Sequence, residues 1–278
     1  MKLIRKILNR LIFSALIFGS VLIIYWVLPL ALNFSNNNPV VIFFDVGQGD
    51  SALIKTATGR LILIDGGPDN KILRHLGKYL PYFCRYLDLV VISHYHEDHI
   101  IGLVETLRRY RVDNLVVPIN SEATTISEEL FKQAKERKTK IITLSDYLQI
   151  DLESNCSLTL TNPDFLGAKS NGNNSIIAQF NCYGHRFLLS GDNEQAVERV
   201  LLANGLELGA DVFKASHHGS ITANSLNFLQ AVNLIRMVIS VGRDNKFNHP
   251  HSEIIKRAEE LGIIVWRTDI LGNIIIRY

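Results

Sequence analysis

Three histidines, a glutamate and an aspartate occur within residues 94–99, which read His-Tyr-His-Glu-Asp-His. The apolar run 89–93 precedes them and predicts a buried strand, and the apolar spacing of residues 100–107 after them predicts a helix. A single histidine would fit an ordinary polar loop. Three histidines with an aspartate, directly after a strand, instead predict a metal site at the junction of the strand and the helix.

The spacing within this loop divides the donors into two pairs. Alternate side chains of an extended segment point the same way, so His94 and His96 are predicted to bind one ion. The next two donors, Asp98 and His99, turn away and are predicted to bind a second ion a few ångströms from the first.

Other polar groups follow other predicted strands. Asp192 comes after the strand 187–190 and a glycine, the position expected of a carboxylate that bridges two cations. His217 and His218 end the strand 212–215, and because adjacent side chains diverge in an extended chain, at most one of them is expected to face the site. His249 is equally compatible with the second ion's shell and with a surface position.

Strands alternate with helices along both halves of the chain, which predicts two sheets covered by helices. We therefore expect an α/β sandwich in one domain, residues 39–278, with its polar groups at strand ends. The isolated His75 is expected on a helix surface.

The N-terminal segment 1–38 differs from the rest. Four cations precede the first acidic residue, Asp45, and Leu11–Leu32 is almost wholly apolar. This length matches a bilayer core, so we expect a membrane anchor and tether that place the following domain outside the cytoplasm. A cleaved signal peptide is the alternative, but its apolar region is normally shorter and followed by a better cleavage site.

The charge of the remaining chain is mildly acidic. Without the four N-terminal cations, 25 basic residues face 27 acidic ones. Proteins that hold nucleic acid through overall charge are clearly basic, so any DNA must be held by a local patch and by the metal ions.

The three cysteines show no paired spacing of the kind found in zinc sites. Cys156 and Cys182 lie in predicted strands and could form one disulfide. Three free thiols, Cys84 included, are an equally good interpretation.

Several motifs together resemble a known family. The pattern His-x-His-x-Asp-His over 94–99 resembles the signature of the metallo-β-lactamase superfamily. The motifs Phe-Asp-Val-Gly-Gln-Gly-Asp (44–50), Leu-Ser-Gly-Asp (189–192) and Ser-His-His-Gly-Ser (216–220) narrow the resemblance to the extracytoplasmic domain of the ComEC competence proteins. The motifs Asp-Gly-Gly (65–67), Asn-Asn-Ser (173–175) and Asn-His-Pro-His (248–251) fit the same pattern.

This resemblance implies an αββα sandwich that binds two divalent ions. It implies that Asp192 lies between the ions and that Asp65 orients a ligand. The expected metal ligands are His94, His96, Asp98, His99, Asp192 and His249, and the expected catalytic residues are Asp98, His217, His218 and Ser220.

Two departures from the wider superfamily and its ComEC members matter. Asn173, Asn174 and Ser175 stand where much of the superfamily has a histidine, and because amides and hydroxyls are weaker donors than imidazole, we expect the first ion to be loosely held or to be Mn²⁺ rather than Zn²⁺. ComEC proteins also carry a channel of many helices, so transport of DNA would require a separate competence channel protein.

The expected function is metal-assisted hydrolysis of a phosphodiester, by a membrane-anchored nuclease that acts on DNA during uptake. The fold alone does not fix the substrate. One alternative is a hydrolase of a small ester or lactam, and the other is a module that holds DNA without cutting it.

Overall fold

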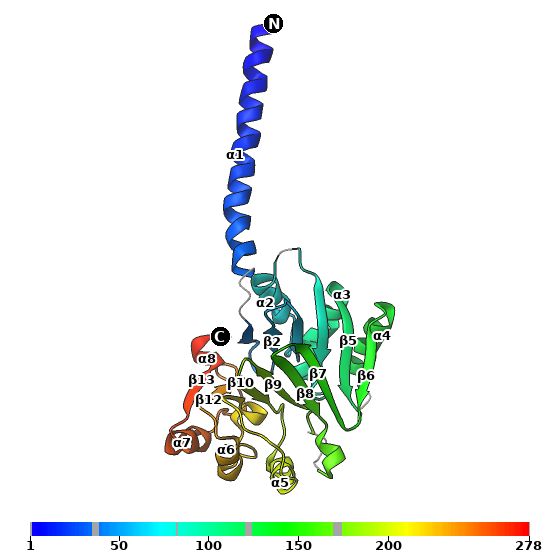
Figure 1. The fold of residues 1–278 in the computed structure, drawn as a ribbon, viewed down its shortest axis with the longest axis vertical. Coiled ribbons are helices and arrows are strands. Elements are labelled where there is room, and N and C mark those ends of the chain that lie inside the picture. Colours follow the sequence, from blue (N-terminus) through cyan, green and yellow to red (C-terminus); the bar gives the residue numbers. More distant parts are fainter. Residues whose placement is uncertain (1, 35–38, 82, 120–123, 169–173, 278) are drawn as a thin grey trace.

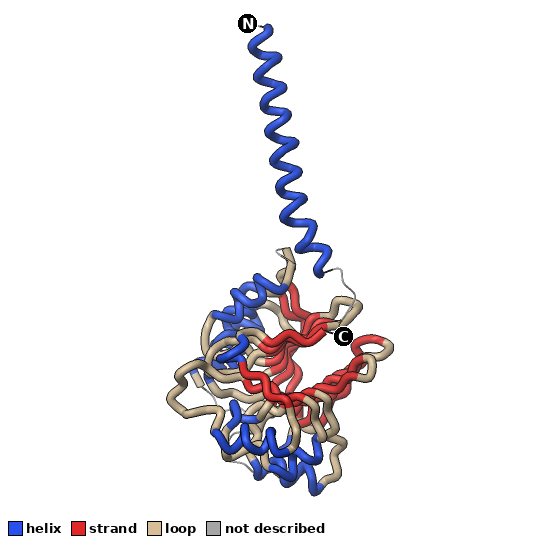
Figure 2. The backbone as a smooth tube through the Cα atoms, turned by 90° about the vertical axis from the view of Figure 1, so that its left-hand side faces the viewer, coloured by secondary structure: helices blue, strands red, loops and turns tan. Residues whose placement is uncertain are grey.

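The computed structural model describes residues 2–34, 39–81, 83–119, 124–168 and 174–277. Over these residues the strands form two sheets that lie face to face, as the red layers of Figure 2 show. The first sheet contains, in spatial order, β14 (Ile274–Arg277), β1 (Val40–Phe43), β2 (Ala52–Lys55), β3 (Leu61–Ile64), β4 (Tyr86–Val91), β5 (Arg111–Pro118) and β6 (Lys140–Leu144). The second contains β13 (Ile264–Arg267), β12 (Arg236–Ile239), β11 (Val212–Lys214), β10 (His185–Leu189), β9 (Ile177–Cys182), β8 (Cys156–Thr161) and β7 (Tyr147–Glu153).

Helices cover the outer face of each sheet (Figure 1). The helices over the first sheet are α2 (Lys71–Tyr79), α3 (Glu97–Arg109) and α4 (Thr125–Glu136). Those over the second sheet are α5 (Gln195–Ala203), α6 (Leu226–Val232) and α7 (Ser252–Glu260). The remaining helical segments are α1 (Lys2–Phe34), α8 (Thr268–Leu271) and the short 3₁₀ turns η1 (Pro163–Leu166) and η2 (Ser216–Gly219).

Apolar side chains fill three layers between these elements. Phe43, Phe180 and Phe187 are buried between the two sheets. Leu103 of α3 packs on the outer face of the first sheet, and Phe228 of α6 packs on that of the second. Burial of each such side chain stabilises the fold by about 1.5–3 kcal/mol relative to exposure. The predicted αββα sandwich is confirmed.

The direction of the strands decides where the polar loops meet. In the first sheet β3, β4, β5 and β6 are parallel, and in the second sheet β10, β11, β12 and β13 are parallel. The carboxyl ends of parallel strands lie at one edge of a sheet, where α/β folds place their sites. The segments that follow β4 and β10 carry five of the six predicted metal ligands, and the sixth, His249, follows β12.

The N-terminal segment forms helix α1, which extends away from the sandwich in both views (Figures 1 and 2). We predicted a membrane-spanning helix over Leu11–Leu32. Among the residues that the structure describes, no helix combines the length and the apolar character that membrane crossing requires, so this prediction is not supported.

His75 corrects a second prediction, because it is buried rather than on a helix surface. Its ring stacks on Phe44 at 5.1 Å between centroids. Its Nε2 lies 2.9 Å from the carbonyl oxygen of Asp45, and its Nδ1 lies 3.1 Å from the side-chain nitrogen of Asn273. The ring thus joins the start of the first sheet to the C-terminal strand.

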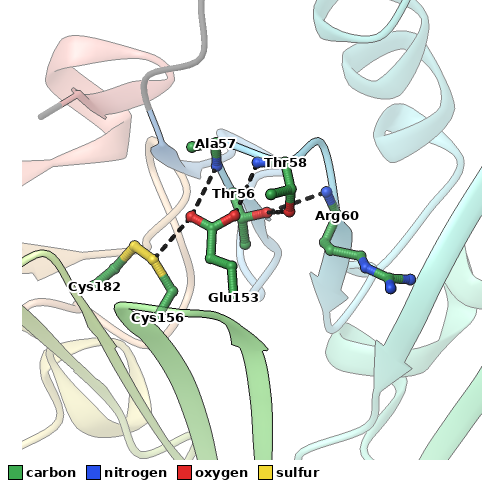
Figure 3. Close-up of a disulfide and its surroundings, with 7 residues drawn as sticks. All are labelled: Thr56, Ala57, Thr58, Arg60, Glu153, Cys156 and Cys182. Carbon is green, nitrogen blue, oxygen red and sulfur yellow. Dashed lines mark hydrogen bonds between the residues drawn. A yellow bond between two sulfur atoms is a disulfide. The ribbon is translucent and has the colours of Figure 1, made fainter.

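A disulfide joins Cys156 to Cys182, the pairing considered from the sequence. These residues are directly opposite each other on β8 and β9. Nearby, the Glu153 carboxylate accepts hydrogen bonds from the backbone N–H groups of Ala57 and Thr58, at 3.3 and 2.8 Å (Figure 3). Glu153 and the two sulfurs lie close enough together to resemble a metal site. A disulfide offers no thiolate, however, so this group does not bind a metal as the zinc sites of proteins do.

Candidate metal centre

One group of four potential ligands gathers at the carboxyl edge of the two sheets. Asp98, His99, Asp192 and His218 each place one donor atom within 4.8 Å of the others. Three of them are buried and Asp98 is half-buried. We call these four residues the second donor group, because it contains the pair predicted for the second ion.

A smaller group shares one of these residues. His94, His96 and Asp192 also place donor atoms within 4.8 Å of one another. We call them the first donor group. His94 is buried, whereas His96 is exposed at the N-terminus of α3. Asp192 belongs to both groups, which is the position predicted for a bridging carboxylate.

His218 Nε2 and Asp98 Oδ2 lie within hydrogen-bond distance of each other, at 3.2 Å, but three other donor atoms of the two groups have no such partner. His94 Nε2, His99 Nε2 and Asp192 Oδ1 are buried and have no partner in the part of the chain that the structure describes. His99 Nε2 lies 3.4 Å from Asp192 Oδ1, and His94 Nε2 lies 3.7 Å from Asp192 Oδ2. Buried polar atoms are normally paired, so convergent lone pairs of this kind fit bound cations. The residues present therefore fit two divalent ions.

In two of the histidines, the ring nitrogen opposite the donor atom has a fixed partner. His99 Nδ1 lies 2.9 Å from Asp65 Oδ2, and Asp65 in turn accepts hydrogen bonds from the backbone and the hydroxyl of Ser93. His218 Nδ1 lies 3.0 Å from the carbonyl oxygen of Ser240, which can only accept. Each partner keeps the proton on Nδ1 and leaves Nε2 for a metal. The role expected of Asp65 agrees with this contact.

The pKa values of the metal-free site reflect its crowding of charges. Burial lowers the pKa of His218, but the carboxylates of Asp192 and Asp50 outweigh it and raise the pKa to about 9. Burial also lowers the pKa of His99, and Asp192 and Asp65 reverse that effect, so this pKa lies well above its ordinary value. His94 differs, because burial and the neighbouring His99 hold its pKa well below the usual range.

A buried ion pair lies beneath the second donor group, and sequence reasoning missed it. The Lys214 ammonium of β11 hydrogen-bonds the Asp50 carboxylate, and both side chains are buried. Lys214 also donates to the carbonyl oxygen of Gly191, beside Asp192, at 3.3 Å. Asp50 Oδ1 lies 3.4 Å from His218 Nδ1. Burial raises the pKa of Asp50, but Lys214 and then His218 lower it well below its ordinary value.

Close backbone contact brings Asp50 to this position. Gly49 has a φ of 152°, and a Cβ on it would lie 2.3 Å from the carbonyl oxygen of Asp98. The backbone N–H of Asp50 donates to that same oxygen at 3.3 Å. Only glycine allows this approach, so the loop after β1 packs directly under the metal-binding loop.

Ser175 supports the first donor group rather than replacing a histidine in it. Its hydroxyl lies 3.2 Å from His94 Nδ1 and accepts a hydrogen bond from the backbone N–H of Asp192 at 2.9 Å. The side chain of Asn174 donates to the carbonyl oxygen of Ala168. Asn173 lies outside the described residues.

His217 and His218 both approach Asp192, contrary to the expectation that at most one would face the site. Their φ angles are 50° and 54°, so the backbone is left-handed rather than extended, and the two side chains do not diverge. His218 Nε2 lies 3.8 Å from Asp192 Oδ1, and His217 Nε2 lies 3.9 Å from Asp192 Oδ2. His218 belongs to the second donor group, where we had predicted only a catalytic role.

The other two predicted residues lie around this centre. The His249 ring lies 6.4 Å from that of His218 and 5.7 Å from that of His217, outside both donor groups. The Ser220 hydroxyl pairs with that of Thr222 at 3.0 Å. The geometry favours His218 over His249 as the fourth ligand of the second ion, and the roles of His249 and Ser220 stay predictions.

A family model described as the metallo-beta-lactamase superfamily matches residues 44–243, which include both donor groups. The chain belongs to this superfamily. Its sheets and its carboxyl-edge ligands are those of a metal-dependent hydrolase.

Curated relatives of this metallo-beta-lactamase domain include ComE operon protein 3 of Bacillus subtilis (strain 168), 28% identical over 254 residues, which cover 84% of this chain and 32% of the relative. Competence protein ComA of Neisseria gonorrhoeae is 27% identical over 237 residues, which cover 85% of this chain and 32% of the relative. The chain thus spans about a third of the length of these relatives. The sequence is that of a ComEC-like domain, as predicted.

Among solved structures, the metallo-beta-lactamase fold protein YhfI of Bacillus subtilis has a TM-score of 0.60 with 13% identity. The match covers 87% of this chain and all of YhfI. At this identity the likeness concerns the fold alone.

Proposed function

We propose that residues 39–278 form a two-metal phosphodiesterase that cleaves DNA during its uptake. The observation that carries the proposal is the position of Asp192, whose two oxygens face separate donor groups. A phosphate that reaches Asp192 therefore meets both ion positions at once, which is the arrangement that suits in-line displacement at phosphorus. DNA as the substrate is supported by the relatives, one of which is named a competence protein.

The chain's own residues would divide the work as follows. His94, His96 and Asp192 would hold the first ion, and Asp98, His99, His218 and again Asp192 the second. When bound, two divalent ions supply Lewis-acid activation of water and of the phosphate oxygens. Asp65 and Ser240 keep the rings of His99 and His218 in the orientation that ligation needs.

We assign the transfer of a proton to His217. It is the less buried of the histidine pair, with 26% of its side chain exposed, and its Nδ1 lies 3.5 Å from Glu194 Oε1. The Glu194 carboxylate would accept the Nδ1 proton of the imidazolium form of this ring, and the Nε2–H of the same ring would donate to the leaving oxygen. In this proposal the transport of DNA is the task of a separate channel protein.

The decisive experiment combines metal analysis with cleavage assays. Purified protein would be loaded with Mn²⁺, Mg²⁺ or Zn²⁺ and assayed on linear DNA, on RNA, and on a panel of small esters and lactams. We expect cleavage of DNA with two bound ions per chain.

Asp98→Asn and Asp192→Asn test the assignment, because these changes keep the shape of the side chain and remove its charge. Both should abolish cleavage while thermal unfolding remains cooperative. Hydrolysis of an ester or lactam without DNA cleavage would support the hydrolase of small molecules instead. Binding of DNA by fully loaded protein without cleavage would support a module that only holds DNA.

A further inference from the structure

A row of rings leads from the second donor group to the surface. The His249 ring lies 6.4 Å from that of His218, and the Phe247 ring stacks on His249 with 5.8 Å between centroids and 25° between planes. Both belong to the loop between β12 and α7. Phe247 is 49% exposed, although nothing in the mechanism above uses it.

This exposed ring is held on a fixed backbone. The side chain of Asn245 accepts hydrogen bonds from the backbone N–H groups of Phe247 and His249, at 3.2 and 3.0 Å. It also donates to the carbonyl oxygens of Gly242 and His249, at 3.0 and 2.7 Å. Gly242 is in turn tied to Gln48, in the loop that carries Asp50, by a hydrogen bond of 3.2 Å. Four hydrogen bonds from one side chain therefore fix the loop without burying its aromatic ring.

The charges around the ring suit an anionic strand. The Lys246 ammonium lies over the Phe247 ring, 5.1 Å from its centroid. Arg243 is exposed a few residues away, and with Asp244 between them these three residues carry a net charge of +1. Lys246 is itself exposed, so its long side chain can turn to a phosphate and leave the ring face to a planar group.

We propose that Phe247 is a stacking platform for a nucleobase of the substrate strand next to the scissile phosphate, with Lys246 contacting a neighbouring phosphate. This inference rests on the proposed function, because it names a substrate subsite of the same centre. A base can stack on Phe247 only when it has left its own duplex stack, so the platform selects single-stranded DNA or frayed ends. Stacking tolerates every base, so the platform confers no sequence preference.

The test compares substrates with and without bases. Phe247→Ala in the full chain, loaded with the metal that supports cleavage, should lower kcat/KM for a single-stranded oligonucleotide by about 5- to 100-fold, the usual range for loss of one base–aromatic stack. The same variant should cleave an oligonucleotide of abasic phosphodiester units as well as the unchanged protein does. Phe247→Trp should keep the preference for bases, whereas Phe247→Leu, which retains bulk but no ring, should lose it.

Phe83→Ala is the matched control, because Phe83 is 75% exposed and precedes the amino end of β4, away from the donor groups. It should leave both substrates unaffected. If Phe247→Ala lowered kcat/KM equally on base-bearing and abasic substrates, or did not lower it at all, the role of Phe247 as a stacking platform would be contradicted.

A binding measurement separates this inference from the proposed function. Fluorescence anisotropy of a labelled single-stranded oligonucleotide would be followed with the cleavage-deficient Asp98→Asn protein, with and without Phe247→Ala. Failure of the unchanged protein to cleave DNA would sink the proposed function alone. Weaker binding in the double variant would then still support the platform, and equal binding would overturn it.

Discussion

The two donor groups share Asp192 but differ in the number of their ligands and in how deeply those ligands are buried. The second group offers four ligands, three of them buried, and its imidazoles are braced by Asp65 and Ser240. The first group offers three, one of which is the exposed His96. Ligand count and fixed orientation both raise affinity, so the second position should bind its ion more tightly. If this holds, one edge of the fold would hold a firmly bound ion beside an exchangeable one.

The shared carboxylate provides the largest expected effect. Asp192→Asn removes one ligand from each group, so both ions should be lost at micromolar metal and activity should fall by more than about 100-fold, the upper effect of losing a supporting residue alone. Metal content measured after gel filtration checks this. Retention of one tightly bound ion would mean that Asp192 contributes less to that ion's binding than its distances to the donor groups suggest.

The buried ion pair of Lys214 and Asp50, beneath the second donor group, should give the next largest effect. Lys214→Met leaves the Asp50 charge buried without its partner, which should lower the free energy of unfolding by about 3–5 kcal/mol. Thermal or urea unfolding of the metal-free protein measures this. The double variant Asp50→Asn/Lys214→Met removes both charges and should recover most of the loss. A double variant no more stable than Lys214→Met would contradict the assigned pairing.

Loss of the Asp65 carboxylate, which orients the His99 ring, should affect the affinities of the two ion positions differently. Asp65→Asn should weaken binding of the second ion by about 10- to 100-fold, since it removes the acceptor that orients the ring, and should change the first ion far less. Calorimetric titration with Mn²⁺ would resolve the two affinities. Because Ser175 contacts His94, Ser175→Ala is the matched variant and should mainly weaken the first ion. If each variant lowered the affinity for both ions equally, the proposed difference between the two donor groups would be contradicted.

The smallest effect expected is a difference in pH dependence. The pKa of metal-free His218 is about 9, so near pH 7 the ring is in its imidazolium form. The second ion must then displace the proton on Nε2. The apparent affinity of this ion should therefore rise with pH, by about tenfold per unit for each displaced proton, until pH 9 is passed. His94 has a lowered pKa and is already neutral near pH 7, so its ring adds nothing to the pH dependence of the first ion. Titrations in two buffers of different ionisation enthalpy would count the released protons.

Much of this arrangement could be predicted because strand ends are visible in a sequence. Apolar runs located the strands before His94, Asp192 and His217, and topology brings such ends together. The strand β7 was missed, although Leu148, Ile150 and Leu152 alternate with polar residues and pack between the sheets. That alternation was the available signal.

Other features depend on contacts that no pattern encodes. Lys214 lies within a strand whose alternation cannot distinguish a buried cation from an exposed one, and its partner Asp50 is 164 residues away. The choice between His218 and His249 depends on a left-handed backbone, which residues other than glycine adopt uncommonly and which the sequence pattern does not predict. The burial of His75 was not predicted because its partners, Asp45 and Asn273, lie near opposite ends of the domain's sequence.

The pairing of β14 with β1 sets the order in which a growing chain can finish folding. Until residues 274–277 have left the ribosome, the first sheet has an unpaired edge at β1, the strand that comes first in the sandwich along the chain. Such an edge is open to pairing with another chain. Residues 274–277 must therefore be synthesised before the edge at β1 is protected from pairing with other chains.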